Sequence, residues 1–222
     1  MSFLRGSQGR IREYSSSKQS SQLTMAYQIE DAAGTTLSFD TLYSHLRTFP
    51  APLYPPGKAR ELELTARIAS LRVHPSLEAA LHLLNLDLPS AHFLVRHMAA
   101  APAFEGMFLH GILHRVEGDY DNARAWYKNV SESGIFFKVW GTQDQGLGFI
   151  DRVEALVKGG KESLQPLETE SARELETVID WCVEKFGKGQ WDDATGAWVR
   201  QSDKGRAIAE QQITGEAGGR RF

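Results

Sequence analysis

The sequence contains a single cysteine, Cys182, among its 222 residues. One thiol excludes a disulfide within the chain and also excludes a zinc site built from several cysteines. Disulfide-rich proteins belong to oxidising compartments, so this scarcity favours a reducing one. Because Cys182 falls on the apolar face of a predicted helix, we expect it to be an inert, buried thiol.

The sequence also lacks any apolar run that approaches the roughly 20 residues of a membrane-spanning helix. No apolar segment near Met1 resembles a secretory signal. The formal charge of −3, from 25 basic and 28 acidic residues, gives no electrostatic reason to expect nucleic acid or an anionic membrane as a partner. We therefore expect a soluble protein that binds neither of them.

Residues 1–24 are rich in serine and arginine and contain one acidic residue, Glu13. Their lack of hydrophobic periodicity predicts a disordered polar tail. The same composition is typical of a transit peptide, so a mitochondrial location is the alternative to a cytoplasmic one. Residues 201–222 are predicted to form a C-terminal segment that ends in a mobile, glycine-rich tail.

Residues 25–200 have the pattern of a single all-α domain. Apolar side chains recur at spacings of three and four, and prolines and glycines fall where helices are expected to begin or end. Residues 49–57 include four prolines and are predicted to form an extended connector. The predicted helices cover residues 38–46, 58–71, 75–84, 89–98, 104–117, 119–130, 148–158 and 171–186.

Two further patterns refine this expectation. Ser171 and Glu174 have the spacing of a capping box, which predicts that the last long helix starts at Ser171. Trp191 and Trp198 indicate one more docked segment after that helix.

Residues 75–130 contain an internal repeat, in which the sequence pattern of one helix pair recurs after 32 residues. Small residues stand where two helix backbones must approach closely, larger apolar residues fill the pair, and the aspartates are expected to cap helices. The matched positions are Ala79 with Gly111, His82 with His114, Asp87 with Asp119, Ala91 with Ala123, Val95 with Tyr127, and Met98 with Val130.

Residues 118–127 resemble the start of the second helix of a tetratricopeptide repeat, and Gly111 corresponds to that family's small residue. His110 and His114 stand where the repeat usually has leucine and tyrosine. The resemblance implies two degenerate tetratricopeptide-like helical hairpins. Two copies are fewer than the three or so that form a self-standing array, so flanking helices must complete the core.

A longer run, residues 110–123 followed by Trp126 and Tyr127, resembles the signature of a group of small helical proteins. That signature is His-x3-His-Arg-x-Glu-x-Asp-Tyr-x-Asn-Ala followed by paired aromatic residues. The resemblance implies a helical fold and no particular reaction. Members often carry an acidic residue after the histidine that matches His92, whereas this chain has Phe93. We expect Trp126 and Tyr127 to be core residues rather than a stacking platform.

Histidines are concentrated in the repeated region, where five of the seven in the chain lie. At 100° per residue, His110, His114 and Glu117 share one stripe of a helix. Two imidazoles and a carboxylate placed in this way could ligate a metal ion or transfer a proton. His92 or His82 could complete such a site. The alternative is a set of interior histidines that only hydrogen-bond neighbouring polar groups.

Arg115 is a further candidate for this site, because a guanidinium binds anionic groups. The favoured alternative is that Arg115 and Arg124 pair with Glu117 and Asp119 and so hold the helix pair together. The sequence has no metalloprotease His-Glu-x-x-His motif, no Glu-x-x-His order of di-iron proteins and no phosphate-binding loop. The identity of any metal or cofactor therefore stays open.

Three functions are compatible with these observations. The leading hypothesis is a non-enzymatic helical module that binds a protein segment or a small ligand in a groove between the helix pairs. The second is a metal-dependent or acid–base enzyme that uses the cluster around His110, His114 and Glu117. The third is a structural subunit of a larger complex.

Overall fold

The computed structural model describes residues 29–30, 36–55 and 58–199, so the predictions for residues 1–24 and 201–222 lie outside the described chain. Apart from a small antiparallel pair of strands, β1 (Ile29–Glu30) and β2 (Thr36–Leu37), the described residues form helices and their connections. The predicted all-α fold is confirmed. None of the helices in these ranges has both the length and the apolar character that crossing a bilayer requires.

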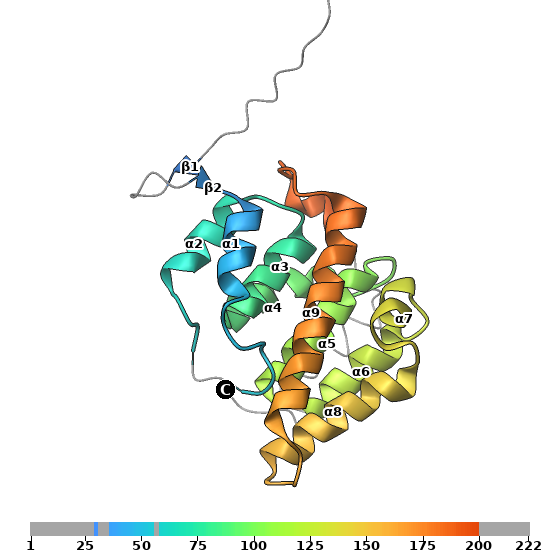
Figure 1. The fold of residues 1–222 in the computed structure, drawn as a ribbon. Coiled ribbons are helices and arrows are strands. Elements are labelled where there is room, and N and C mark those ends of the chain that lie inside the picture. Colours follow the sequence, from blue (N-terminus) through green and yellow to red (C-terminus); the bar gives the residue numbers. More distant parts are fainter. Residues whose placement is uncertain (1–28, 31–35, 56–57, 200–222) are drawn as a thin grey trace, which may run out of the picture.

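Nine α-helices and one short 3-10 helix follow one another in the described chain (Figure 1). They are α1 (Phe39–Leu46), α2 (Glu63–Ser70), α3 (Pro75–Leu84), α4 (Leu88–Arg96), α5 (Phe104–Glu117), α6 (Tyr120–Val130), α7 (Gly134–Trp140), α8 (Gln143–Val157), α9 (Leu164–Phe186) and η1 (Ala194–Ala197).

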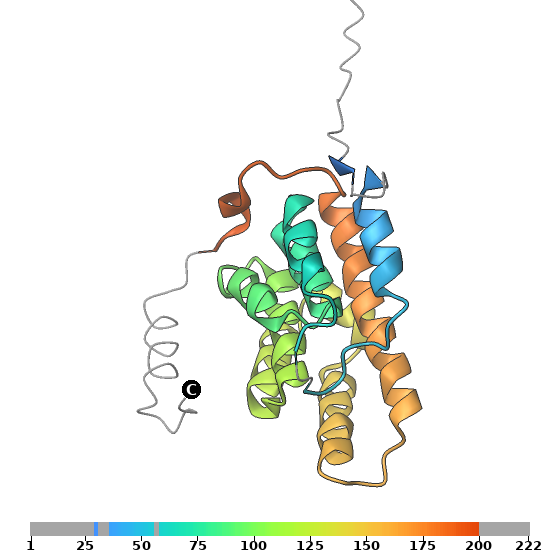
Figure 2. The same ribbon diagram turned by 90° about the vertical axis from the view of Figure 1, so that its left-hand side faces the viewer.

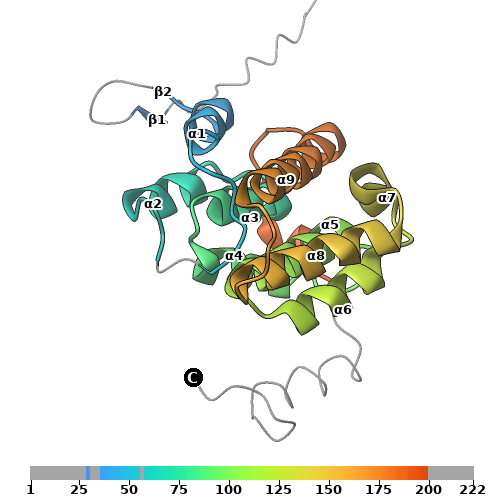
Figure 3. The same cartoon turned by 60° about the horizontal axis from the view of Figure 1, so that its bottom comes forward.

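The repeated region forms two packed helix pairs, α3 with α4 and α5 with α6, as the 32-residue spacing predicted. Helices α4 and α5 join the two pairs, and α8 lies alongside α6 (Figure 3). The long helix α9 packs against α3, α7 and α8. The orange α9 runs beside the blue α1 (Figure 2), and ion pairs from Arg47 to Glu176 and from Lys188 to Asp40 connect the two. The flanking helices thus complete the core of the two pairs.

The predicted helix caps are present at both aspartates of the repeat. The side chain of Asp87 accepts the backbone N–H of Ser90 at the start of α4, and Asp119 accepts that of Asn122 at the start of α6. Pro75 lies in the first turn of α3, where a missing N–H costs nothing. Cys182 is buried as expected, and burial raises the pKa of its thiol. The caps, the position of Pro75 and the burial of Cys182 could be predicted because each follows from residues within one or two helical turns.

The predicted start of the last long helix at Ser171 was wrong, because α9 begins at Leu164. Ser171 lies inside the helix and is buried, and its hydroxyl donates to the carbonyl of Pro52 over 2.6 Å. Glu174 is also buried and accepts from Arg115 and Trp140. The Ser-x-x-Glu spacing therefore supplies tertiary contacts rather than a capping box.

Two other helix starts differ from the predictions. Helix α2 begins at Glu63 rather than at residue 58. Helix α8 begins at Gln143, with Thr142 as its N-cap, so it continues through glycines that the sequence indicated as breaks. At Gly146 an added Cβ would lie 2.6 Å from the ring of Phe136. This glycine is needed for close packing inside a helix and does not end one.

Helix α5 is held in place by a buried ion pair between Arg115 and Glu174 of α9. Both side chains have 0% exposure, and the Arg115 Nη2 atom lies 2.7 Å from Oε2 of Glu174. Arg115 also donates to the carbonyl of Leu53 over 3.0 Å, which fixes the proline-rich connector against α5. Tyr127 and Trp140 donate to the other oxygen of Glu174. Burial lowers the pKa of Arg115, but the facing Glu174 carboxylate raises it on balance.

Substitution of the small residue in the second helix pair tests the packing of that pair. A Cβ at Gly111 would lie 2.8 Å from the ring of Tyr127 and 2.9 Å from Cβ of Trp126. We expect Gly111→Ala to lower the free energy of unfolding by about 1–3 kcal/mol, because the overpacking outweighs the gain in helix propensity. Gly148→Ala in α8 is the matched control, since nothing lies within 4 Å of its added Cβ. It should raise stability by up to about 1 kcal/mol in urea denaturation. Equal effects of the two substitutions would contradict this packing.

Removing the carboxylate of Glu174 tests the buried ion pair. We expect Glu174→Gln to lower the free energy of unfolding by about 3–5 kcal/mol, because Arg115 is left as an uncompensated buried charge. Glu176→Gln, two residues along the same helix, breaks an ion pair whose side chains are 51% and 42% exposed and should cost less than about 1 kcal/mol. Circular dichroism in a urea series measures both variants. A loss below 1 kcal/mol for Glu174→Gln would show that the pair does not hold α5.

Candidate functional site

Three histidines from two neighbouring helices meet on a side of α5 that faces away from its ion pair. His92 comes from α4, and His110 and His114 come from α5. One ring nitrogen from each histidine lies within 4.8 Å of one from each of the others. The closest approach is 3.1 Å, between Nε2 of His92 and Nε2 of His110. The predicted convergence of His110 and His114 with a histidine of the first helix pair is therefore present.

The rings are packed into a fixed arrangement. The ring of His110 is nearly parallel to that of His114, with centroids 4.7 Å apart, and to the indole of Trp126, with centroids 4.4 Å apart. His110 is therefore sandwiched between the two. The ring of His92 meets both of the other imidazoles edge-on. Because every ring is held by another, the nitrogen positions are set by packing before any ligand arrives.

Glu117 lies one turn after His114 and faces the outer edge of the cluster. Its Oε2 atom is 3.2 Å from Nδ1 of His114, within ion-pair distance but out of line for a good hydrogen bond. Its Oε1 atom is 3.9 Å from Nδ1 of His92. A carboxylate in this position favours a proton on Nδ1 of both rings, which leaves their Nε2 lone pairs free to accept. Glu117 therefore orients the rings rather than joining the three converging nitrogens.

Asn122 makes the remaining polar contact of the cluster. Its Nδ2 atom lies 3.1 Å from Nε2 of His114, so the amide donates to that lone pair when Nδ1 carries the proton. Asn122 is positioned by the start of α6, where its backbone N–H is bound by the capping Asp119. The turn between α5 and α6 thus contributes to the histidine cluster directly.

The cluster is deeply placed on one side and reaches solvent on the other. His110 and His114 have exposures of 6% and 7%, while the side chains of His92 and Glu117 are about one third exposed. Burial lowers the pKa of His110 well below its ordinary value, and the neighbouring charges of His114, His92 and Arg96 lower it further. Burial also lowers the pKa of His92. These two imidazoles are therefore neutral at neutral pH.

Two buried ring nitrogens of the cluster make no hydrogen bond with the described residues, Nδ1 of His114, which only contacts Glu117, and Nδ1 of His110. Nδ1 of His110 makes no hydrogen bond with any residue that the structure describes. A buried polar atom without a partner is uncommon and costs stability. The alternative from the sequence, a set of fully satisfied interior histidines, therefore does not account for His110.

Two residues that the sequence placed near this site lie elsewhere. Arg115 points to a different side of α5 and pairs with Glu174 instead of Glu117, because one residue step turns a helix by 100°. His82 is buried with Nδ1 at 3.0 Å from the cap residue Asp87 and does not join the three converging rings. Arg124 pairs with Asp121, Asp151 and Glu154 rather than with Asp119.

Sequence reasoning missed two other residues that contribute to the site. Trp126 was expected in the core with Tyr127, but only Tyr127 is fully buried, and the indole of Trp126 covers His110. Arg96 follows His92 by four residues, and its charge acts on both His92 and His110. The spacing of Arg96 from His92 was the signal available in the sequence.

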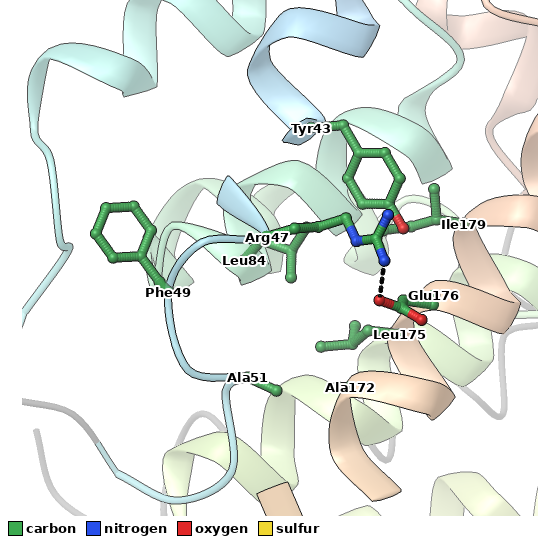
Figure 4. A pocket seen from close by; sticks show the side chains of 9 residues that line it. All are labelled: Tyr43, Arg47, Phe49, Ala51, Leu84, Ala172, Leu175, Glu176 and Ile179. Carbon is green, nitrogen blue, oxygen red and sulfur yellow. Dashed lines mark hydrogen bonds and ion pairs between the residues drawn. The ribbon is translucent and has the colours of Figure 1, made fainter. Parts of the chain in front are cut away.

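A pocket elsewhere on the molecule does not compete with the histidine cluster as a site for a substrate. It lies between α1, the proline-rich connector, α3 and α9, and its lining includes Tyr43, Arg47 and Glu176 (Figure 4). Its cavity volume is about 40 Å³, which admits only a few water molecules. The ion pair from Arg47 to Glu176 crosses it and ties α1 to α9. The pocket is therefore a packing defect between these elements.

The lowered pKa values predict how the stability of the metal-free protein depends on pH. Below about pH 6.5 the unfolded chain binds more protons than the folded chain at His92 and His110, so stability is lost as the pH falls, by up to about 1.4 kcal/mol per pH unit for each proton. His110→Leu removes one of these groups and the unpartnered nitrogen. We expect it to match or exceed the wild type in stability at pH 7.5 and to lose less by pH 5.5.

Urea denaturation in the presence of a chelator measures this difference. His74, whose pKa is lowered to about 4 by burial, adds to the acid loss in both proteins and cancels in the comparison. Parallel stability curves for wild type and His110→Leu would mean that His110 is not held neutral by its surroundings.

Comparison of the chain with protein-family models, with curated proteins and with solved structures finds no match. The resemblances to tetratricopeptide repeats and to the group of small helical proteins therefore stay predictions. The geometry of the histidine cluster is the basis for assigning a function.

Proposed function

We propose that this protein binds a divalent transition-metal ion through His92, His110 and His114. The observation that carries the proposal is the convergence of three ring nitrogens within 4.8 Å of one another. In a tetrahedral site with metal–nitrogen bonds of about 2.0–2.1 Å, ligand nitrogens are about 3.3 Å apart. The nitrogens of His92 and His110 are already near this separation at 3.1 Å, so the movement needed to bind the ion is that of His114 toward the other two rings.

The protonation states of the cluster suit metal binding. Metal ions bind neutral imidazole, and the pKa values of His92 and His110 are lowered, so protons compete little at neutral pH. Glu117 faces Nδ1 of His114 and of His92, the arrangement in which a carboxylate orients metal-ligating histidines through the far nitrogen. The ligating atom of His92 and of His114 is then Nε2, and in His110 it is the Nε2 atom that faces His92. At His114 the ion replaces the hydrogen bond that the amide of Asn122 donates to Nε2.

Imidazole ligands narrow the class of metal. Three nitrogen donors suit zinc, copper, nickel or iron, whereas magnesium and calcium prefer oxygen. Three protein ligands leave a fourth position open, as in catalytic zinc sites, and the side chain of His92, about one third exposed, places that position on the solvent side. Such an ion polarises a bound group or lowers the pKa of a bound water. Metal-dependent chemistry, the second hypothesis from the sequence, is thus favoured.

The groove proposed between the helix pairs receives less support. The two pairs meet where α4 packs on α5, and at this junction the rings of His92 and His110 are in contact. A peptide seated there would have to separate the histidines. Binding of a protein segment in that position is therefore the weaker proposal, while the same location suits a single ion.

Metal titration of the purified, chelator-treated protein tests the proposed site. We expect one Co²⁺ or Zn²⁺ ion per chain, and at least about 100-fold weaker binding for His110→Leu, since losing a ligand should exceed the 10–100-fold effect typical of residues that only orient ligands. Glu117→Gln should weaken metal binding by a factor within that 10–100-fold range. Calorimetry gives stoichiometry and affinity, and the visible spectrum of Co²⁺ reports nitrogen ligation.

The control is His45→Gln, which removes a histidine in α1 that contacts Glu61 on the surface. It should bind metal like the wild type. Absence of stoichiometric metal binding, or equal affinity in the wild type and His110→Leu, would rule out the three-histidine site.

A further inference from the structure

Arg96 stands beside the histidine cluster at the end of α4. It follows His92 by four residues, which places it about 6 Å along the helix and on the same face. Its side chain is exposed. Arg96 is therefore at the solvent-side mouth of the cluster.

Arg96 has no anionic partner in the part of the chain that the structure describes. The arginines at positions 47, 72, 115, 124 and 152 form ion pairs with carboxylates, but Arg96 forms none. The carboxylate of Glu117 is directed at His114 and His92. The planar guanidinium of Arg96 can therefore donate its hydrogen bonds to a bound external group.

The charge balance of the loaded site calls for an anion. The three imidazoles are neutral ligands, and among the described residues Glu117 is the carboxylate that lies within ion-pair distance of His92 and His114, while His110 forms no ion pair. A divalent ion together with Arg96 therefore outweighs Glu117 by two positive charges. In a partly buried site such an excess favours an anionic ligand over neutral water.

We propose that the open position of the metal ion takes an oxyanion, a carboxylate or a phosphate, whose second oxygen is bound by Arg96. This inference rests on the proposed metal site and names the class of ligand or substrate that it accepts. One oxygen occupies the fourth coordination position, and the guanidinium binds another oxygen, the geometry in which arginine recognises planar or tetrahedral oxyanions. Arg96 selects for the anion, while the three histidines hold the ion.

Anion titration of the Co²⁺-loaded protein tests this assignment. Inorganic phosphate and acetate are the probes, and the change in the visible Co²⁺ spectrum reports an anion entering the coordination sphere. We expect Arg96→Gln to bind the preferred anion about tenfold or more weakly, because one charge-assisted hydrogen-bonding partner is lost. The anion affinity of Arg96→Lys should lie between those of the wild type and Arg96→Gln, since lysine keeps the charge but cannot donate two parallel hydrogen bonds. The ratio of phosphate to acetate affinity identifies which oxyanion the site prefers.

Lys161→Gln is the matched control, because it removes one exposed positive charge in the turn between α8 and α9. It should leave the anion affinity unchanged. Equal anion affinity in the wild type and Arg96→Gln, with Co²⁺ still bound by both, would overturn the role of Arg96 and leave the metal site intact. Failure of Co²⁺ to bind the wild type would overturn both proposals.

Discussion

The buried ion pair between Arg115 and Glu174 is the constraint on which the rest of the structure depends. Two charges with no exposure are stable only when most of their remaining donors and acceptors are satisfied. The partners are Tyr127, Trp140, Ser171 and the connector carbonyls, while Nε of Arg115 makes no hydrogen bond with the described residues. They come from helices and a connector far apart in the chain, so this network fixes α5, α6, α7 and α9 relative to one another.

Helix α5 carries two polar sites because neighbouring residues on a helix point in different directions. Arg115 enters the ion-pair network, while His114, one residue earlier, turns toward α4. The two sites differ in their degree of satisfaction. Among the described residues of the ion-pair network, Nε of Arg115 makes no hydrogen bond, whereas in the histidine cluster Nδ1 of both His110 and His114 makes none. A rigid, largely satisfied network thus supports a neighbouring cluster in which more of the buried nitrogens lack a hydrogen bond.

Much of the candidate site could be predicted from the sequence, because its central part is local. His110, His114 and Glu117 share a stripe of one helix, and a period of 3.6 residues is enough to bring them together. The choice of His92 over His82 was not decidable from spacing, since both lie on the first helix pair. It depends on which face of that pair packs against α5. Trp126 was taken for a core residue because its hydrophobicity does not reveal that an imidazole lies against it.

The sequence by itself determined the helical class, the two helix pairs with their capping aspartates, and the stripe of histidines, because each depends on residues within one or two turns of each other. Only the tertiary structure decided the partner of Arg115, which lies 59 residues away, and the buried positions of Ser171 and Glu174 inside α9. A Ser-x-x-Glu spacing is the same in a capping box and in a buried network. Long-range packing selects between them, and no local pattern encodes that choice.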